Sequence, residues 1–121
     1  RVSEKEKIDI FKTHHIIALP SYGEGQPICI LEGMAAGMAV LSTLVGSIPE
    51  IIINGENGFL GKPGDIETLA RALIKLMDLT VLEKIGNDNK KIAIERYSFS
   101  RVVGDNISVY SKIMQIPFSS I

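Results

Sequence analysis

The sequence lacks tryptophan, contains one cysteine, and has almost no net charge, with 13 basic and 14 acidic residues among 121. A net charge of −1 gives no electrostatic basis for binding nucleic acid or an anionic membrane surface. Lys90-Lys91 is the one adjacent pair of basic residues, and it fits a solvated helix face. We therefore expect no nucleic-acid partner.

Long apolar runs and paired cysteines are absent as well. Cys29 stands alone, which excludes an intrachain disulfide and favours a reducing compartment. Glu32 interrupts the longest apolar stretch well short of the ~20 residues that span a bilayer, so we expect no transmembrane segment. Because helix-like sequence begins at once after Arg1, we also expect a piece of a longer protein.

Apolar periodicity predicts strands that alternate with helices in the first half of the chain, followed by helices alone. The predicted strands are 14–19, 39–43 and a short one near Phe59-Leu60. The predicted helices start after Ser3, cover 27–36, follow Ser47, cover about 66–77, and then run from Thr80 to about Tyr97 and from Ser100 to Met114. Helical crossovers imply parallel strands, so the fold class is α/β, a Rossmann-like parallel sheet with flanking helices. Three strands suggest a single partial domain over 1–121, with an α/β core at 1–61 and a helical segment at 62–121.

Several residues have local structural interpretations. Ser3 with Glu6, Ser47 with Glu50, and Thr80 with Glu83 have the spacing of helix caps, and Gly86 is a weak point in its helix. An amphipathic stripe is predicted on the helix after Asp65, listed as Ile66, Leu69, Ala70, Leu73, Ile74 and Met77. His14 and His15 fit a structural role better than metal binding, because no Cys or Asp stands at ligand spacing.

Two glutamates, Glu24 and Glu32, lie eight positions apart around Gly25 and Pro27. Glu24 falls in the loop after a strand, and Glu32 lies roughly 7–8 Å along the following helix. Between them is a helix N-terminus, which favours an anion such as phosphate. A phosphate-binding position between two carboxylates suits a nucleotide-sugar, which has hydroxyl groups at both ends and a pyrophosphate in the middle. A plain alternative is that Glu32 is an exposed helix residue and Glu24 a loop charge.

The apolar positions Ile28, Leu31 and Ala35 predict that Leu31 packs inward and that Glu32 faces the ligand crevice. Gly23-x-Gly25-x-x-Ile28 weakly matches a dinucleotide-binding pattern, which would indicate an oxidoreductase. That pattern requires glycine at position 28 and an acidic residue about twenty positions further on, where Thr43, Leu44 and Val45 stand instead.

The stretch from Leu19 to Leu60 resembles the donor-binding signature of GT-B glycosyltransferases, in particular the large retaining family 4 with its Glu-x7-Glu motif. Glu24 and Glu32 match that motif, and weaker similarity extends over nearly the whole chain. The other matching positions are Leu19-Pro20-Ser21, Gly25, Pro27, Leu31, Met34-Ala35, Gly37, Val40, Gly46, Pro49-Glu50, Gly55 and Gly58. The resemblance implies the C-terminal part of the nucleotide-sugar-binding domain of such an enzyme.

The resemblance also implies roles for individual residues. Glu24 would face the donor sugar as the catalytic residue, and Glu32 would bind the ribose hydroxyls. Backbone N–H groups around Gly25, Gln26 and Ile28 would hold the sugar and the distal phosphate. Val2 and Ser3 match the segment that contacts the nucleobase.

The implied reaction transfers a sugar from a UDP- or GDP-linked donor with retention, without a cofactor or bound metal. A sugar or lipid-linked acceptor would bind a missing N-terminal domain, and the 121 residues alone would be inactive. The implied location is cytoplasmic, with any peripheral contact at the inner membrane made by the missing domain. The alternative is a non-catalytic nucleotide-binding or scaffold relative.

Two positions depart from the family pattern. Ala39 stands where proline is usual, and Ser47 replaces a second glycine, which puts a phosphate contact by that loop in doubt. The basic residues that grip the diphosphate in the family would lie before Arg1.

Overall fold

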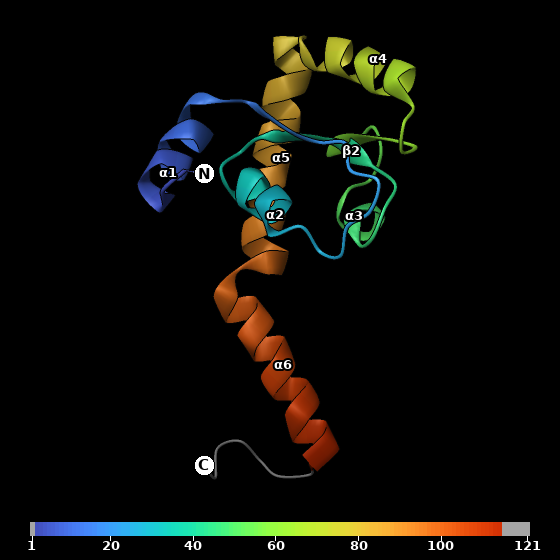
Figure 1. Ribbon diagram of the computed structural model, residues 1–121. Coiled ribbons are helices and arrows are strands. Elements are labelled where there is room, and N and C mark those ends of the chain that lie inside the picture. The colour runs from blue at the N-terminus through green and yellow to red at the C-terminus, as the bar shows by residue number, and fades with distance from the viewer. Residues whose placement is uncertain (1, 115–121) are drawn as a thin grey trace.

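A computed structural model describes residues 2–114 as a three-stranded parallel sheet with helices on both faces (Figure 1). The strands are β1 (Ile16–Leu19), β2 (Ala39–Thr43) and β3 (Gly58–Gly61), in the order β1-β2-β3. Ile17 is paired with Val40, and Leu41 with Phe59. The predicted α/β class and parallel sheet are confirmed.

Six helices precede, connect and follow the strands in the described part of the chain. They are α1 (Glu4–Thr13), α2 (Ile28–Ala35), α3 (Ile48–Ile51), α4 (Ile66–Leu76), α5 (Leu79–Tyr97) and α6 (Phe99–Met114). The last helix, α6, extends away from the sheet and buries none of its residues (Figure 1). Within residues 2–114, no helix combines the length and apolar character that crossing a membrane requires.

The central strand β2 separates two apolar layers. Val40 packs with Ile30 and Met34 of α2 and with Ala93 of α5 on one face. Ala39 and Leu41 point to the other face, where α4 contributes Ala72 and Leu76. Successive side chains of a strand point to opposite faces, so the apolar run 39–43 is buried on both sides.

Helix α5 is fastened to the sheet by a buried amide. Asn89 is fully buried, and its Nδ2 donates to the carbonyl oxygens of Met38, at 2.9 Å, and Asn57, at 2.8 Å. These two residues directly precede β2 and β3. One side chain thus fixes α5 against the starts of two strands.

Two predicted element starts are corrected by the structure. The first strand begins at Ile16 rather than at position 14, because His14 ends α1 and its Nδ1 lies 2.8 Å from the Ile10 carbonyl oxygen. Helix α5 begins at Leu79, since the Asp78 carboxylate accepts from the N–H groups of Thr80 and Val81. Asp78 therefore takes the cap that was predicted for Thr80. The helix cap predicted for Ser3 and Glu6 does form, as a capping box at the start of α1.

Two predicted apolar stripes are also corrected. On α2 the buried residues are Ile30, Gly33 and Met34, whereas Ile28 and Ala35 are exposed. Leu31 is half-buried and packs against the core, as predicted. On α4 the buried residues are Ala72 and Leu76. Most of the predicted α4 stripe is exposed, namely Ile66, Ala70, Leu73, Ile74 and Met77. Both helices carry more apolar surface than the described sheet covers, so periodicity alone did not identify the buried side.

Candidate functional site

Glu24 lies in the loop between β1 and α2, and its carboxylate is held from within that loop. Oε1 of Glu24 accepts a hydrogen bond of 2.6 Å from the Ser21 hydroxyl. The chain that leaves β1 is in turn held by β2, because Thr43 Oγ1 donates to the Ser21 carbonyl at 2.6 Å. Thr43 is fully buried, so this anchor is rigid. The half-buried Glu24 carboxylate therefore has a defined direction.

The loop after β2 supports the Glu24 loop from the other side. Gly46 has a φ of +55°, and a Cβ built there would lie 2.2 Å from the Glu24 carbonyl oxygen. Ser47 donates twice to the Gly25 carbonyl, from its N–H at 3.0 Å and from its hydroxyl at 3.1 Å. The capping box predicted for Ser47 is wrong, because its hydroxyl is turned toward Gly25 and caps nothing. A serine in place of the usual glycine thus fastens the two loops together.

Helix α2 begins between the two glutamates with an open N-terminus. Its N-cap is the buried Pro27, which offers no capping side chain, and its first turn holds no acidic residue. Gly25, Gln26 and Ile28 around this terminus are exposed. Uncapped N–H groups and the helix dipole favour an anion at this position.

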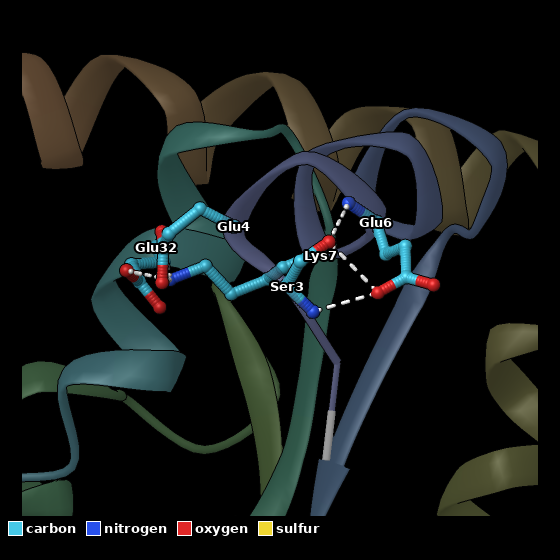
Figure 2. A network of polar contacts seen from close by, with 5 residues as sticks. All are labelled: Ser3, Glu4, Glu6, Lys7 and Glu32. Carbon is cyan, nitrogen blue, oxygen red and sulfur yellow. Dashed lines mark hydrogen bonds and ion pairs between the residues drawn. The ribbon is translucent and has the colours of Figure 1, made fainter.

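Glu32 lies on α2 and points toward α1 (Figure 2). Its Oε1 is 2.9 Å from Nζ of Lys7, and Nζ also lies 2.9 Å from Oε2 of Glu4. Hydrogen bonding to Glu32, and then to Glu4, raises the pKa of Lys7 above its usual value. Glu24 and Glu32 therefore have separate partners, Ser21 for the residue in the loop before α2 and Lys7 for the residue within α2.

The segment before α1 contains Val2 and Ser3, the two residues predicted to contact the nucleobase. Ser3 donates its N–H and its hydroxyl to Oε2 of Glu6, at 2.7 and 2.8 Å, and its carbonyl accepts from the N–H of Lys7. Its polar groups are all engaged in starting α1. Val2 is 54% exposed and stays accessible.

Sequence reasoning missed Ser21 and Lys7. Ser21 stands three positions before Glu24, a spacing from which the bond could be inferred. Lys7 is 25 positions from Glu32, so no local pattern indicates their contact. Within residues 2–114, no group of three or more His, Cys, Asp or Glu side chains is arranged to hold a metal ion.

An apolar groove of about 300 Å³ lies apart from the glutamates, on the face of the sheet covered by α4. It is lined by Ala18, Pro20, Leu41, Ile66, Leu69, Ala70 and Leu73. These side chains offer neither charge nor hydrogen-bonding groups, so the polar site stays at the carboxyl ends of β1 and β2.

Comparison with known proteins identifies relatives in sequence and in fold. The chain is 27% identical over 113 residues to an MMP alpha-(1->4)-mannosyltransferase of Mycolicibacterium hassiacum, covering 92% of this chain and 28% of that protein. The C-terminal domain of a glycosyl transferase group 1 family protein (LpcC) from Francisella tularensis superposes with a TM-score of 0.75 at 29% identity, covering 82% of this chain and 51% of that one. Anabaena HepE, solved in complex with UDP-glucose, superposes with a TM-score of 0.74 at 25% identity, covering 88% and 29%.

The chain thus spans between a quarter and a third of the curated relatives that it matches first. Its fold is that of the C-terminal domain of GT-B glycosyltransferases, as predicted. The match to the family described as Glycosyl transferases group 1 extends over residues 1–94. Since this is well over half of the sequence, the chain belongs to the group 1 glycosyl transferase family.

Proposed function

We propose that this chain is the donor-binding part of an enzyme that transfers a sugar from a nucleoside-diphosphate sugar to an acceptor. The observation that carries the proposal is the open N-terminus of α2, with one carboxylate held in the loop before the helix and a second held within the helix. The complex of the related HepE with UDP-glucose supports a donor of this class. The alternative of a non-catalytic relative is not favoured, because the relatives are named as transferases.

In this proposal the two glutamates have different tasks. Glu32 accepts hydrogen bonds from the two ribose hydroxyls, a geometry that suits the two oxygens of one carboxylate. Glu24, aimed by Ser21, faces the donor sugar near the reacting carbon. Its negative charge stabilises the positive charge that develops on the sugar as the diphosphate departs.

The departing diphosphate needs positive charge and hydrogen-bond donors. The N–H groups around Gly25, Gln26 and Ile28 supply donors at the start of α2, where the helix dipole favours an anion. We place the nucleobase beside Val2 alone, because the polar groups of Ser3 are engaged in the cap of α1. The N–H donors of α2, together with basic side chains outside this chain, then stabilise the negative charge of the diphosphate without a resident metal or cofactor.

The remaining features of the proposal concern the whole enzyme. From the Glu-x7-Glu spacing we infer that the transfer retains the anomeric configuration of the sugar. We also infer that the donor is linked to UDP or GDP, and that a sugar or lipid-linked acceptor binds a facing domain. A cytoplasmic location is inferred from the unpaired Cys29, with any peripheral membrane contact made outside this chain.

The test is steady-state kinetics of the enzyme that contains this chain, with the exposed Glu56 as a matched control. Glu32→Ala is expected to raise KM for the donor by roughly ten- to a hundredfold, because a charged hydrogen bond contributes about 1.5–3 kcal/mol in ground and transition states alike. Glu24→Ala is expected to lower kcat, and Glu56→Ala to change neither. Equal effects of the first two substitutions on KM alone would contradict the assignment.

A further inference from the structure

Lys7 makes the polar contact between α1 and α2. Helix α1 buries none of its residues. Within residues 2–114, the Lys7–Glu32 contact is the one hydrogen bond or ion pair between α1 and another element. This one side chain therefore makes the polar link that holds the start of α1 beside the α2 carboxylate.

We propose that Lys7 is a positioning residue that holds the Glu32 carboxylate ready for the ribose hydroxyls and keeps the start of α1 beside it. This inference rests on the proposed function, in which Glu32 is the ribose ligand. Lys7 itself is not assigned a contact with the donor.

The geometry allows both bonds at once. Lys7 Nζ approaches one carboxylate oxygen, Oε1 at 2.9 Å, and leaves Oε2 and a second lone pair of Oε1 for hydroxyl donors. Glu4 contacts the same ammonium at 2.9 Å and holds it in place (Figure 2). The Lys7 and Glu32 side chains are 28% and 38% exposed, so solvent screens this pair less than a fully exposed one.

Loss of the ammonium would therefore act through Glu32. An untethered glutamate samples several rotamers, and a ligand that needs one of them must order the side chain on binding. The loss should fall on ligands that use the carboxylate, which means those with ribose hydroxyls. A general loss of charge or of helix stability would weaken every nucleotide equally.

The experiment is a ligand-observed NMR titration of the 121-residue chain with UDP, GDP and ADP and with their 2′,3′-dideoxy counterparts. The wild-type chain is expected to prefer the ribose form of its best ligand roughly tenfold. In Lys7→Met and Lys7→Gln the preference is expected to fall to near one, while Lys7→Arg restores most of it. Lys5→Met removes the same charge from an exposed position of the same helix and should keep the wild-type preference.

The possible outcomes distinguish the positioning role of Lys7 from the proposed ribose-binding role of Glu32. A preference that survives Glu32→Ala, or is missing in the wild type, overturns the ribose role of Glu32 and this inference with it. A preference lost in Glu32→Ala but kept in Lys7→Met overturns the inference alone. Equal weakening of ribose and dideoxy forms in Lys7→Met also overturns it, because that is the result of a purely structural role.

Amide hydrogen exchange of the ligand-free chain provides a second readout. Lys7→Met and Glu32→Ala are both expected to accelerate exchange in α1 while β2 stays protected, which also shows that the variants are folded. Unchanged exchange in α1 of both variants would show that the pair does not hold this helix, and would overturn the proposal.

Discussion

At the scale of single residues, Gly46 determines where the Glu24 loop can lie. Its positive φ alone would cost an alanine about 1–2 kcal/mol. The added Cβ would also collide with the carbonyl oxygens of Glu24 and Gly25, at 2.2 and 2.5 Å. Because both obstacles are backbone atoms, the loop must move for the methyl group to fit.

We predict that Gly46→Ala lowers the free energy of unfolding by more than Gly55→Ala does. Gly55 also has a positive φ, +85°, but a Cβ there meets no atom within 4 Å, so this control reports backbone strain alone. Urea unfolding of the two variants measures the difference, which is expected to be about 1 kcal/mol or more. Equal losses would show that Gly46 does not press on the Glu24 loop.

Whether a contact of the site could be predicted depends on how far apart its two residues are in the sequence. The Glu24–Glu32 spacing was evident, because a strand, a glycine loop and a helix follow each other directly. The Ser47 hydroxyl was misassigned, since serine before a Pro-Glu step fits a capping box and its true acceptor is 22 positions away. Lys7 could not be predicted, because its contact depends on how α1 packs against α2.

At the scale of elements, helix α5 approaches the turn after α2 closely at a glycine. A Cβ on Gly86 of α5 would lie 2.2 Å from the carbonyl oxygen of Gly37, which ends the turn after α2. The sequence indicated a weak point in a helix at Gly86. In the structure the missing side chain allows two backbones to come together.

We predict that Gly86→Ala destabilises the protein although alanine favours helix by about 1 kcal/mol over glycine. The collision with the backbone of Gly37 must cost more than that gain, because neither segment can rotate a side chain away. Gly104→Ala in α6, where a Cβ meets no atom within 4 Å, is the control and should be neutral or stabilising. Thermal unfolding compares them, and a stabilised Gly86→Ala would refute the close approach.

The cap of α4 predicts a dependence on pH. Hydrogen bonds from the backbone and then the side chain of Thr68 lower the pKa of Asp65 below its ordinary value of 3.8. Because the folded-state pKa is depressed, this stabilisation is present above the unfolded pKa and is lost as the pH falls through the folded value. Asp65→Asn keeps an acceptor oxygen without titrating.

The wild-type chain should therefore exceed Asp65→Asn in free energy of unfolding at neutral pH and lose that advantage below about pH 4. Urea unfolding of both chains between pH 7 and pH 3 measures it. A difference that stays constant over this range would mean that the charge of Asp65 does not stabilise α4.

Element types were predicted better than element faces. Strand β2 was predicted at its observed bounds, because a short apolar run between glycine-bounded turns fits little else. The faces of α2 and α4 were predicted only in part: Leu31 and Leu69 pack against the core, but most of the other predicted positions are exposed, because both helices are apolar on more than one side. Which side becomes buried depends on the sheet, and the periodicity of one helix does not contain that information.

At the scale of the whole molecule, the apolar groove between α4 and the sheet joins exposed residues of α4 such as Ile66 and Leu73, which are 79% and 43% exposed. Contiguous apolar surface of this kind promotes association. We predict concentration-dependent self-association of the 121-residue chain by sedimentation velocity, reduced in Leu73→Gln. A chain that stays monomeric at all concentrations, or a variant that associates as before, would contradict this use of the groove.

The central claim is that this chain holds half of a nucleotide-sugar site, and titration with UDP, GDP and ADP tests it most directly. One helix N-terminus and one ribose carboxylate should give a dissociation constant of about 1 mM, equivalent to about −4 kcal/mol. Calorimetry and ligand-observed NMR of the wild type and Glu32→Ala measure it, and binding should be lost in the variant. Millimolar binding that needs Glu32 is the predicted result. Micromolar binding would show that the site is complete within these residues, and binding that survives Glu32→Ala would place the nucleotide elsewhere.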